Sequence, residues 1–378
     1  MSSPSASCSL PLPLPLPCPP GLVLPHPVQS EVKIPIWEHL SSSPGERLTV
    51  KHCSIQPLPR RPGSRHVAAY HLLIHDRVSG QTYPLALIAK RDTTRGVGKA
   101  VREYAALTLL WDQGFASDDK LRIPKPFDLL PDQNLIFQEN ARGDKLTGYL
   151  GDNTEASINY VSMAGLWLAK LHAIKVSPPV PCCYDAELSS LDLFVRELSA
   201  VQPSLLVRVQ KLAEAIRQRL VSCTDATASL VHGDYHPEHI LVADDSITVI
   251  DFERFGGGDR AKDVGSFLAH ARSSCYLAGK PPEMADREIG AFLASYFRAV
   301  PSDTGAPMAS RIAAFNAHSS LEALYYVAAV LKVSDQQRLA PYLECAEKSG
   351  VLATRQFASW SLRSADSPQY RHAAIAGA

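Results

Sequence analysis

Residues 229–255, SLVHGDYHPEHILVADDSITVIDFERF, combine an apolar strand pattern with an unusual density of ionisable side chains. The pattern predicts two short strands, 239–242 and 248–250, joined by a turn at 243–245. The ionisable side chains flank these strands: His232, Asp234, His236, His239, Asp251 and Glu253. Burying so many ionisable groups in a core costs free energy, and such clusters are typical of functional sites, so the segment predicts a functional site.

The two aspartates of this segment suggest a division of chemical labour. Asp234 lies on the loop before one strand and Asp251 follows the next, so a hairpin brings both carboxylates to the same end. One carboxylate can accept a proton from an attacking hydroxyl while the other binds a hard cation through oxygen. Phosphoryl transfer requires that combination, because it depends on positioning and on neutralising the developing charge.

The rest of the chain predicts a small α+β lobe followed by a mainly helical one. In the first lobe, residues 31–140, the pattern predicts strands and one helix: strands 48–57, 66–75, 82–90 and 134–138, and helix 99–111. In the second lobe, residues 141–378, it predicts several helices: one ending near His172, then 188–200, 205–222, 284–300 and 312–331. The predicted class is therefore α+β with unequal lobes.

Composition excludes several classes of partner and location. The chain has 38 basic and 38 acidic residues, so no global field steers it to nucleic acid or an acidic membrane surface. No window is apolar enough to span a bilayer. Residues 1–30 are proline-rich and are expected to be a disordered tail rather than a secretion signal. Together with eight scattered cysteines, these features predict a cytoplasmic protein.

The segment His232–His239, HGDYHPEH, with IDFE at Ile250–Glu253 downstream, resembles the paired signature of the aminoglycoside phosphotransferase and choline kinase family. The segments Gly257–Arg260 and Asp263–Gly265, and the helix ending LAKLH at His172, are also similar to that family. The resemblance covers about residues 45–330 and implies a bilobal, protein-kinase-like fold, with a small β-rich N-lobe and a larger, mainly helical C-lobe. It implies an ATP-dependent kinase that phosphorylates a hydroxyl of a small molecule.

The resemblance also implies a role for individual residues. Asp234 would be the general base and Asp251 would hold Mg²⁺ on the ATP phosphates. Lys90 would contact those phosphates, and Glu103 on the following helix would pair with Lys90 and hold it in place. The stretch Gln138, Glu139 and Asn140 falls where the family binds adenine through backbone groups.

One position departs from the family pattern. Five residues after the expected base, where the family places a metal-binding Asn, this chain has His239. Because imidazole suits Zn²⁺ or Mn²⁺ better than Mg²⁺, the departure predicts an altered metal preference, with Mn²⁺ as an alternative to Mg²⁺. His232 and His236 are expected to order the loop, as is Asp263, and Asp259 is expected to cap the helix that follows it.

Two other interpretations remain at this stage. The first is a metal-dependent hydrolase whose ligands are His232, Asp234, His236 and His239. The second is a pseudokinase that serves as a non-catalytic binding module. Zinc in the protein without ATP binding would favour the hydrolase, and the absence of any thermal shift with ATP and Mg²⁺ or Mn²⁺ would favour the module.

The sequence identifies neither the acceptor nor the oligomeric state. Four acidic residues are candidates for a rim that binds an amine-bearing acceptor: Glu283, Asp286, Glu288 and Glu322. Four aromatic residues could contact a sugar or a quaternary amine, but their helical spacing predicts core positions: Tyr296, Phe297, Tyr325 and Tyr326.

Overall fold

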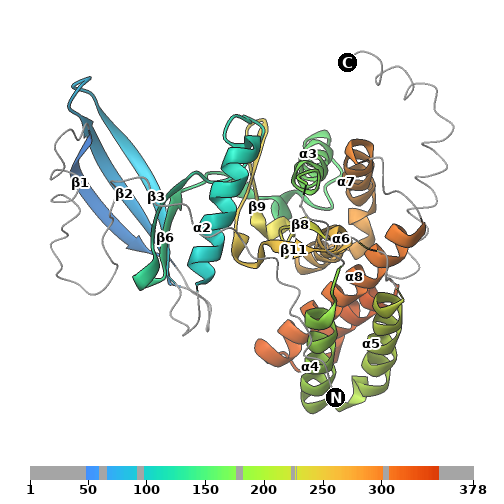
Figure 1. The fold of residues 1–378 in the computed structure, drawn as a ribbon. Helices are drawn as coiled ribbons and strands as arrows, with labels where there is room; N and C mark the ends of the chain where they lie inside the picture. Colours follow the sequence, from blue (N-terminus) through green and yellow to red (C-terminus); the bar gives the residue numbers. More distant parts are fainter. Residues whose placement is uncertain are drawn as a thin grey trace, which may run out of the picture. The chain divides into compact units, whose positions relative to one another are not determined.

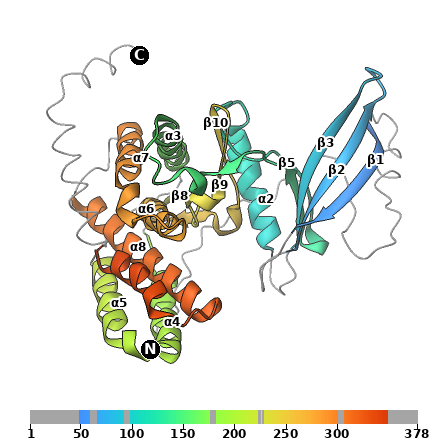
Figure 2. The ribbon, with the colours of Figure 1, turned by 180° about the vertical axis from the view of Figure 1, so that it is seen from behind.

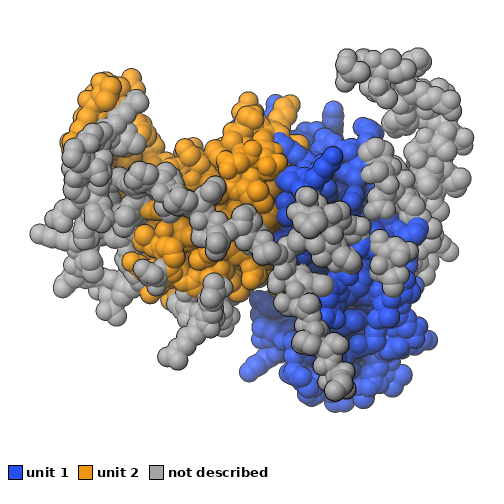
Figure 3. All heavy atoms as spheres, in the orientation of Figure 1, with its two compact units in different colours: residues 1–9, 144–247, 256–378 blue, residues 10–143, 248–255 orange. Residues whose placement is uncertain are grey.

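The computed structural model describes residues 48–58, 66–91, 98–175, 182–222, 226, 228–300 and 306–348. The chain divides into two compact units (Figure 3), and each is described here by itself. Unit 2 comprises residues 10–143 and 248–255, and unit 1 comprises 1–9, 144–247 and 256–378. The predicted tail, residues 1–30, lies outside the described residues. The predicted α+β class is confirmed, because unit 2 is built on an antiparallel sheet and unit 1 is mainly helical.

Unit 2 is organised around a five-stranded antiparallel sheet with the strand order β1-β2-β3-β6-β5 (Figures 1 and 2). Its strands are β1 (Leu48–Pro57), β2 (His66–Asp76), β3 (Thr82–Arg91), β5 (Pro126–Leu130) and β6 (Leu135–Glu139). Side chains of β2 alternate between the two faces, with Tyr70, Leu72 and Ile74 buried and His71 and Leu73 exposed. The buried face forms a core in which the rings of Tyr70 and Phe137 meet edge to face at 5.4 Å.

One helix covers part of this sheet. Helix α2 (Lys99–Leu110) contacts β5 and β6 and continues into a short π-helical turn, Trp111–Phe115. Its buried side chains recur at helical spacing, and they include Tyr104, Leu107 and the carboxylate-bearing Glu103. A buried carboxylate requires a partner, so the helix is tied to the sheet by a polar contact as well as by apolar ones.

The described residues of unit 1 form mainly helices, with several short strands. The helices include α3 (Glu155–His172), α4 (Asp185–Val201), α5 (Leu206–Val221), α6 (Arg260–Leu277), α7 (Asp286–Ala299) and α8 (Ala306–Tyr325), and residues 336–348 are also helical. Helix α3 lies along α7, and α8 contacts α4, α5 and α6 (Figures 1 and 2). The N-termini of α3 and α6 are capped by Thr154 and Asp259, whose side chains accept backbone N–H bonds from Ser157 and Ala261. The sequence-based expectation that Asp259 caps a helix is thus confirmed.

The short strands of unit 1 support the loop between them. Strand β8 (Ser229–Val231) pairs with β11 (Gly256–Gly258), and β7 (Asp144–Lys145) pairs with β9 (Ile240–Ala243). The chain passes from unit 1 into unit 2 within β10 (Ser246–Val249). A two-residue strand, β4 (Leu121–Arg122), belongs to unit 2. Residues 232–239 therefore leave one short strand and enter another, which fixes both ends of the loop that carries Asp234.

Stacked aromatic rings form the centre of unit 1. The rings of Phe267 and Phe292 lie 3.9 Å apart and nearly parallel, and Tyr235 stacks on Trp167 at 5.6 Å. Tyr296, on α7, is also completely buried. Three helices and the loop at residue 235 thus share one aromatic core.

A glycine allows the close approach of α3 and α7. A Cβ at Gly165 would clash with the backbone oxygen of Phe292 and would lie 3.1 Å from the backbone nitrogen of Tyr296. We expect Gly165→Ala to destabilise the protein by roughly 1–3 kcal/mol, as overpacking does. Gly290→Ala is the matched control, because no atom lies within 4 Å of its added Cβ and helix propensity favours alanine. Thermal melts of both variants should therefore shift in opposite directions, and a Gly165→Ala melt at or above that of the parent would contradict this account.

Two further expectations from composition bear on the described residues. None of the helices in that part of the chain is long and apolar enough to cross a membrane. The five cysteines found there are not joined by disulfides: Cys53, Cys182, Cys183, Cys275 and Cys345.

Candidate active site

The loop that carries Asp234 is held by a buried carboxylate. Asp263, which has no exposed surface, accepts the backbone N–H of His232 at 2.7 Å and that of Gly233 at 2.8 Å. Gly233 has φ +80°, a conformation that glycine adopts without strain. The ring Nδ1 of His232 accepts the backbone N–H of Asp234 at 3.3 Å. The expectation that His232 and Asp263 order this loop is confirmed.

Asp263 belongs to a larger buried network. The Nε2 of His172 lies 3.2 Å from Oδ2 of Asp263, and its Nδ1 lies 2.8 Å from the hydroxyl of Tyr296. Burial lowers the pKa of His172, despite the opposing effect of Asp263. Burial alone would raise the pKa of Asp263, but the hydrogen bonds from His172 and His232 lower it below its ordinary value. A neutral ring that donates to an ionised carboxylate and accepts from Tyr296 satisfies all three groups.

The residue after Asp234 anchors the loop to the helices. Tyr235 is fully buried, and its hydroxyl donates to the backbone oxygen of Ala164 on α3 at 2.8 Å. The side chain of Asp234, by contrast, remains 23% exposed. The loop therefore places its carboxylate at a surface that a second molecule can reach, on a rigid support.

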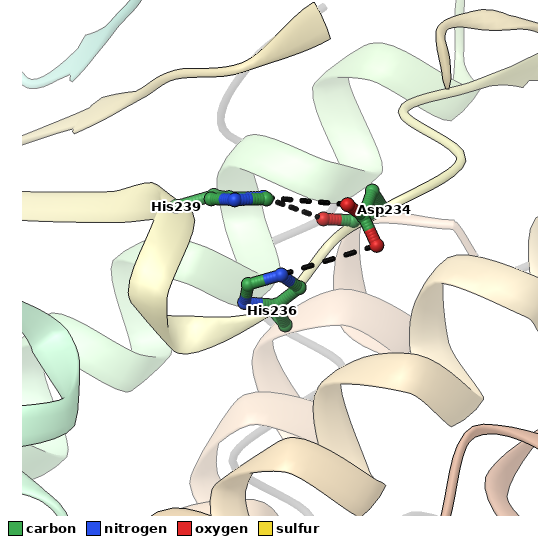
Figure 4. Close-up of side chains that lie close together, drawn as sticks. All are labelled: Asp234, His236 and His239. Carbon is green, nitrogen blue, oxygen red and sulfur yellow. Dashed lines mark hydrogen bonds and ion pairs between the residues drawn. The ribbon is translucent and has the colours of Figure 1, made fainter. Parts of the chain in front are cut away.

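Asp234 lies beside two histidines of the same loop (Figure 4). Its carboxylate oxygens are 3.9 Å from Nε2 of His236 and 3.9 Å from Nδ1 of His239. The same Nδ1 of His239 lies 3.0 Å from the backbone oxygen of Asp234, so it carries the proton of that hydrogen bond. The rings of His236 and His239 lie close together, with centroids 3.8 Å apart and ring planes inclined by 35°.

A third histidine, which the sequence did not single out as part of this group, lies beside it. His270 on α6 stacks on His236 with ring centroids 4.6 Å apart. Burial lowers the pKa of His270, although Asp234 and Glu322 act in the opposite direction. The only sequence signal was a histidine on a helix thirty-four positions after His236, and spacing of that kind does not predict a contact.

The predicted phosphate-binding pair is formed within unit 2. Nζ of Lys90, on β3, lies 2.6 Å from Oε1 of Glu103 on α2 and 3.5 Å from Oδ1 of Asp251. Lys90 is 8% exposed and Glu103 is completely buried. The buried Glu103 thus has its counter-ion, and the ammonium of Lys90 is held between two carboxylates.

Asp251 has an unusual backbone conformation for a residue with a side chain. Its φ of 71° and ψ of 66° lie in the left-handed region, and the short 3₁₀ turn Phe252–Arg254 follows it. Phe252 is fully buried, and this turn packs against α2. Glu253 forms an ion pair with Lys99 at 3.3 Å, and its backbone oxygen accepts a hydrogen bond from the side chain of Arg102. Strain of this kind is typical of functional sites, because the surrounding contacts fix a side chain's direction.

The predicted adenine-binding stretch lies at the end of β6. Gln138 is buried and Glu139 is paired with Arg122 at 3.4 Å. The backbone N–H of Glu139 donates to Lys125 and that of Asn140 donates to Ala86. These two N–H groups are therefore engaged within the protein, and an adenine contact at Gln138–Asn140 stays a prediction.

The chemistry of the donor set fits a hard cation at Asp251. Its carboxylate is 28% exposed and offers oxygen ligands, which Mg²⁺ prefers. His239 offers nitrogen, which fits Mg²⁺ less well, and its Nδ1 is already used by the carbonyl of Asp234. Four residues were considered as ligands for a hydrolase. Among the described residues, Asp234, His236 and His239 lie close enough together to hold a metal ion. His232 is not part of this group, and its ring Nδ1 accepts the backbone N–H of Asp234.

Several of the residues considered for acceptor binding have a structural role instead. Glu288 is completely buried and accepts the backbone N–H groups of Gly151 and Asn153 at 2.7 and 3.0 Å, so it is structural rather than part of a rim. Asp286 pairs with Arg272 at 3.0 Å. Tyr296 and Phe297 are core residues, as predicted, whereas Tyr325 and Tyr326, for which the same was predicted, are only partly buried.

The chain matches a known protein family over most of its length. Residues 74–332 match the model of the phosphotransferase enzyme family, which is more than half of the chain. No curated protein matches the sequence.

Solved structures share the fold at low sequence identity. A thermostable mutant of aminoglycoside phosphotransferase APH(4)-Ia, in ternary complex with ADP and hygromycin B, is 14% identical; the match covers 80% of this chain and 95% of that one, with a TM-score of 0.51. Amicoumacin kinase hAmiN, in complex with AMP-PNP, Ca²⁺ and its ligand Ami, is 17% identical over 78% and 88%, with a TM-score of 0.52. Plasmodium vivax ethanolamine kinase is 15% identical over 82% and 83%, with a TM-score of 0.50. These matches confirm the predicted kinase-like fold.

Proposed function

Because the chain belongs to the phosphotransferase enzyme family, we propose that it transfers the γ-phosphate of ATP to a hydroxyl of a small molecule, with Asp234 as the base. The observation that carries the proposal is the ion cluster of Lys90, Glu103 and Asp251. A cation held at fixed geometry by two carboxylates is suited to the phosphates of a metal-bound nucleotide.

Each group has one task in the proposed reaction. The carboxylate of Asp234 accepts the proton of the acceptor hydroxyl, whose oxygen forms the new bond to the γ-phosphorus. The bond from that phosphorus to the bridging oxygen breaks, and ADP leaves with the bonding electron pair. Lys90 donates hydrogen bonds to phosphate oxygens, and Glu103 keeps its ammonium group in position. When bound at Asp251, Mg²⁺ would neutralise the charge that develops on the phosphates.

The relatives suggest which acceptors to test. The structural neighbours include complexes with hygromycin B and amicoumacin and an ethanolamine kinase, so both antibiotics and amino alcohols belong in a screen. The proposal predicts ADP production that depends on one of these hydroxyl-bearing acceptors and on Mg²⁺ or Mn²⁺. ATP binding without any turnover across the screen would support the pseudokinase interpretation, and acceptor cleavage without ATP would support the hydrolase.

Substitution of Lys90 tests the nucleotide half directly. We expect Lys90→Ala to lower kcat/KM for ATP by about 10²–10³-fold, as loss of one charge-stabilising donor does in other enzymes. Glu103→Gln should produce a smaller fall, because the ammonium group remains but loses its ionic partner. Lys120→Ala, which removes an exposed lysine of the same unit, is the matched control. Steady-state kinetics at varied ATP measure all three, and equal values for Lys90→Ala and Lys120→Ala would contradict the assigned role.

A further inference from the structure

The three side chains grouped in Figure 4 are also arranged to bind a metal ion, a role separate from the proton transfer proposed for Asp234. Asp234, His236 and His239 each offer one ligand atom, and these atoms all lie within 4.8 Å of one another. All three side chains are partly buried rather than solvated. Two imidazoles and a carboxylate form a donor set typical of Zn²⁺ and related transition metals rather than of Mg²⁺.

The local backbone explains why these donors converge. His236 is followed by Pro237, which begins the 3₁₀ turn Pro237–His239. The backbone N–H of His239 donates to the carbonyl of His236 at 2.9 Å and closes the turn. The turn therefore brings residues 236 and 239 together, and the centroids of the two imidazole rings lie 3.8 Å apart. The sharp turn at Gly233 then brings Asp234 to the same side.

The distances match a site that needs only small side-chain rotations. Zn²⁺ binds nitrogen and oxygen ligands at about 2.0–2.2 Å, so the donors of a tetrahedral site lie roughly 3.3 Å apart. The carboxylate of Asp234 is already 3.9 Å from Nε2 of His236. It is also 3.9 Å from Nδ1 of His239, and an ion bound by that nitrogen would replace its hydrogen bond to the carbonyl of Asp234. Three protein ligands would leave the fourth position to water, as in other zinc sites with an open position.

We propose that Asp234, His236 and His239 form a binding site for a divalent transition-metal ion such as Zn²⁺, and that an ion bound there inhibits the enzyme. The ion binds through lone pairs of the Asp234 carboxylate, so that carboxylate can no longer accept the proton of an acceptor hydroxyl. The inhibitory consequence rests on the proposed kinase function, whereas the binding itself does not. The site uses none of the oxygen ligands that we propose Asp251 offers to the nucleotide metal.

Binding is tested on the full chain without nucleotide, after removal of metal with a chelator. Co²⁺ bound by imidazole nitrogen in a site of low coordination number gives visible absorption, and Zn²⁺ should displace it stoichiometrically. We expect His236→Asn and His239→Asn to weaken Zn²⁺ binding at least about 100-fold, because even an outer-sphere partner is worth 10–100-fold in affinity. His71→Asn removes an exposed histidine from β2 and should bind Zn²⁺ as the parent does.

Three results would overturn the proposal. They are the absence of Co²⁺ absorption from the folded parent, equal Zn²⁺ affinity in the parent and both loop variants, and an equal loss of affinity in His71→Asn. Circular dichroism of each variant shows that the fold is retained. If the chain phosphorylates an acceptor, buffered Zn²⁺ should lower its kcat at saturating MgATP, a chelator should restore it, and His236→Asn should resist. An inactive parent that binds Co²⁺ at this loop would contradict the proposed function and leave the metal site standing.

Discussion

Replacement of Asp234 by asparagine is expected to lower kcat by about 10²–10⁴-fold, the usual contribution of a general base. Asparagine has nearly the same shape, but its amide cannot accept the proton of the acceptor hydroxyl. The backbone of the loop is held by Asp263, His232 and Tyr235, and the Asp234 side chain takes no part in those contacts. The variant should therefore fold normally.

The measurement separates chemistry from nucleotide binding. Because Lys90, Glu103 and Asp251 belong to the other unit, the affinity of the Asp234→Asn variant for an ATP analogue should equal that of the parent. Asp245→Asn is the matched control, since it changes an exposed aspartate of the turn between β9 and β10. Unchanged kcat in Asp234→Asn would remove Asp234 from the mechanism, and a lower melting temperature would show instead that its role is structural.

Removal of the Asp263 carboxylate is expected to have the largest effect on stability. Asp263→Ala leaves the backbone N–H groups of His232 and Gly233 without their acceptor and removes the partner of His172. Breaking a buried charged network in this way lowers the free energy of unfolding by about 3–5 kcal/mol. For a domain of this size that corresponds to a fall of roughly 10 °C in the melting temperature.

A surface carboxylate provides the comparison. Asp192 pairs with Arg217 but is 69% exposed, so Asp192→Ala should change the free energy of unfolding by less than about 1 kcal/mol. Chemical denaturation of both variants gives the two values. Similar values for Asp263→Ala and Asp192→Ala would show that the buried network contributes little.

The same network predicts the direction of the pH dependence. Because the pKa of His172 is lowered in the folded protein, the unfolded chain binds more protons below the ordinary value of 6.5. The lowered pKa of Asp263 acts in the same direction at more acidic pH, since its stabilisation is lost as the carboxylate becomes protonated. The free energy of unfolding should therefore fall as the pH is lowered below 6.5. The Asp263→Ala variant should lack the part of this pH dependence that is due to the Asp263 carboxylate.

Much of the fold follows from sequence periodicity. The alternation of Tyr70, Leu72 and Ile74 identifies β2, and helical spacing identifies α3 and α7, because burial on one face dictates both patterns. Strand β5, which begins at Pro126, was not among the predicted strands, and it forms because β6 supplies its hydrogen bonds. Strand β11 consists of three glycines and has no strand propensity of its own, so only its pairing with β8 makes it a strand.

The candidate site, like the fold, could be predicted from the sequence only in part. The motif identifies Asp234 and Asp251, and the distance between Lys90 and Glu103 agrees with the pair that the resemblance implied. Their catalytic roles stay predictions. The contact of His236 with His239 and its stacking on His270 were not predicted, because they depend on the 3₁₀ turn and on the position of α6.

The placement of residues 248–255 affects how the protein is made. This segment lies between two stretches of unit 1, yet its contacts assign it to unit 2 together with residues before Gly143. A fragment that ends at Gly143 would lack Asp251 and would expose the face of α2 that contacts the turn Phe252–Arg254. During synthesis unit 2 is therefore complete only after more than a hundred residues of unit 1 have been added, so it cannot fold to completion first.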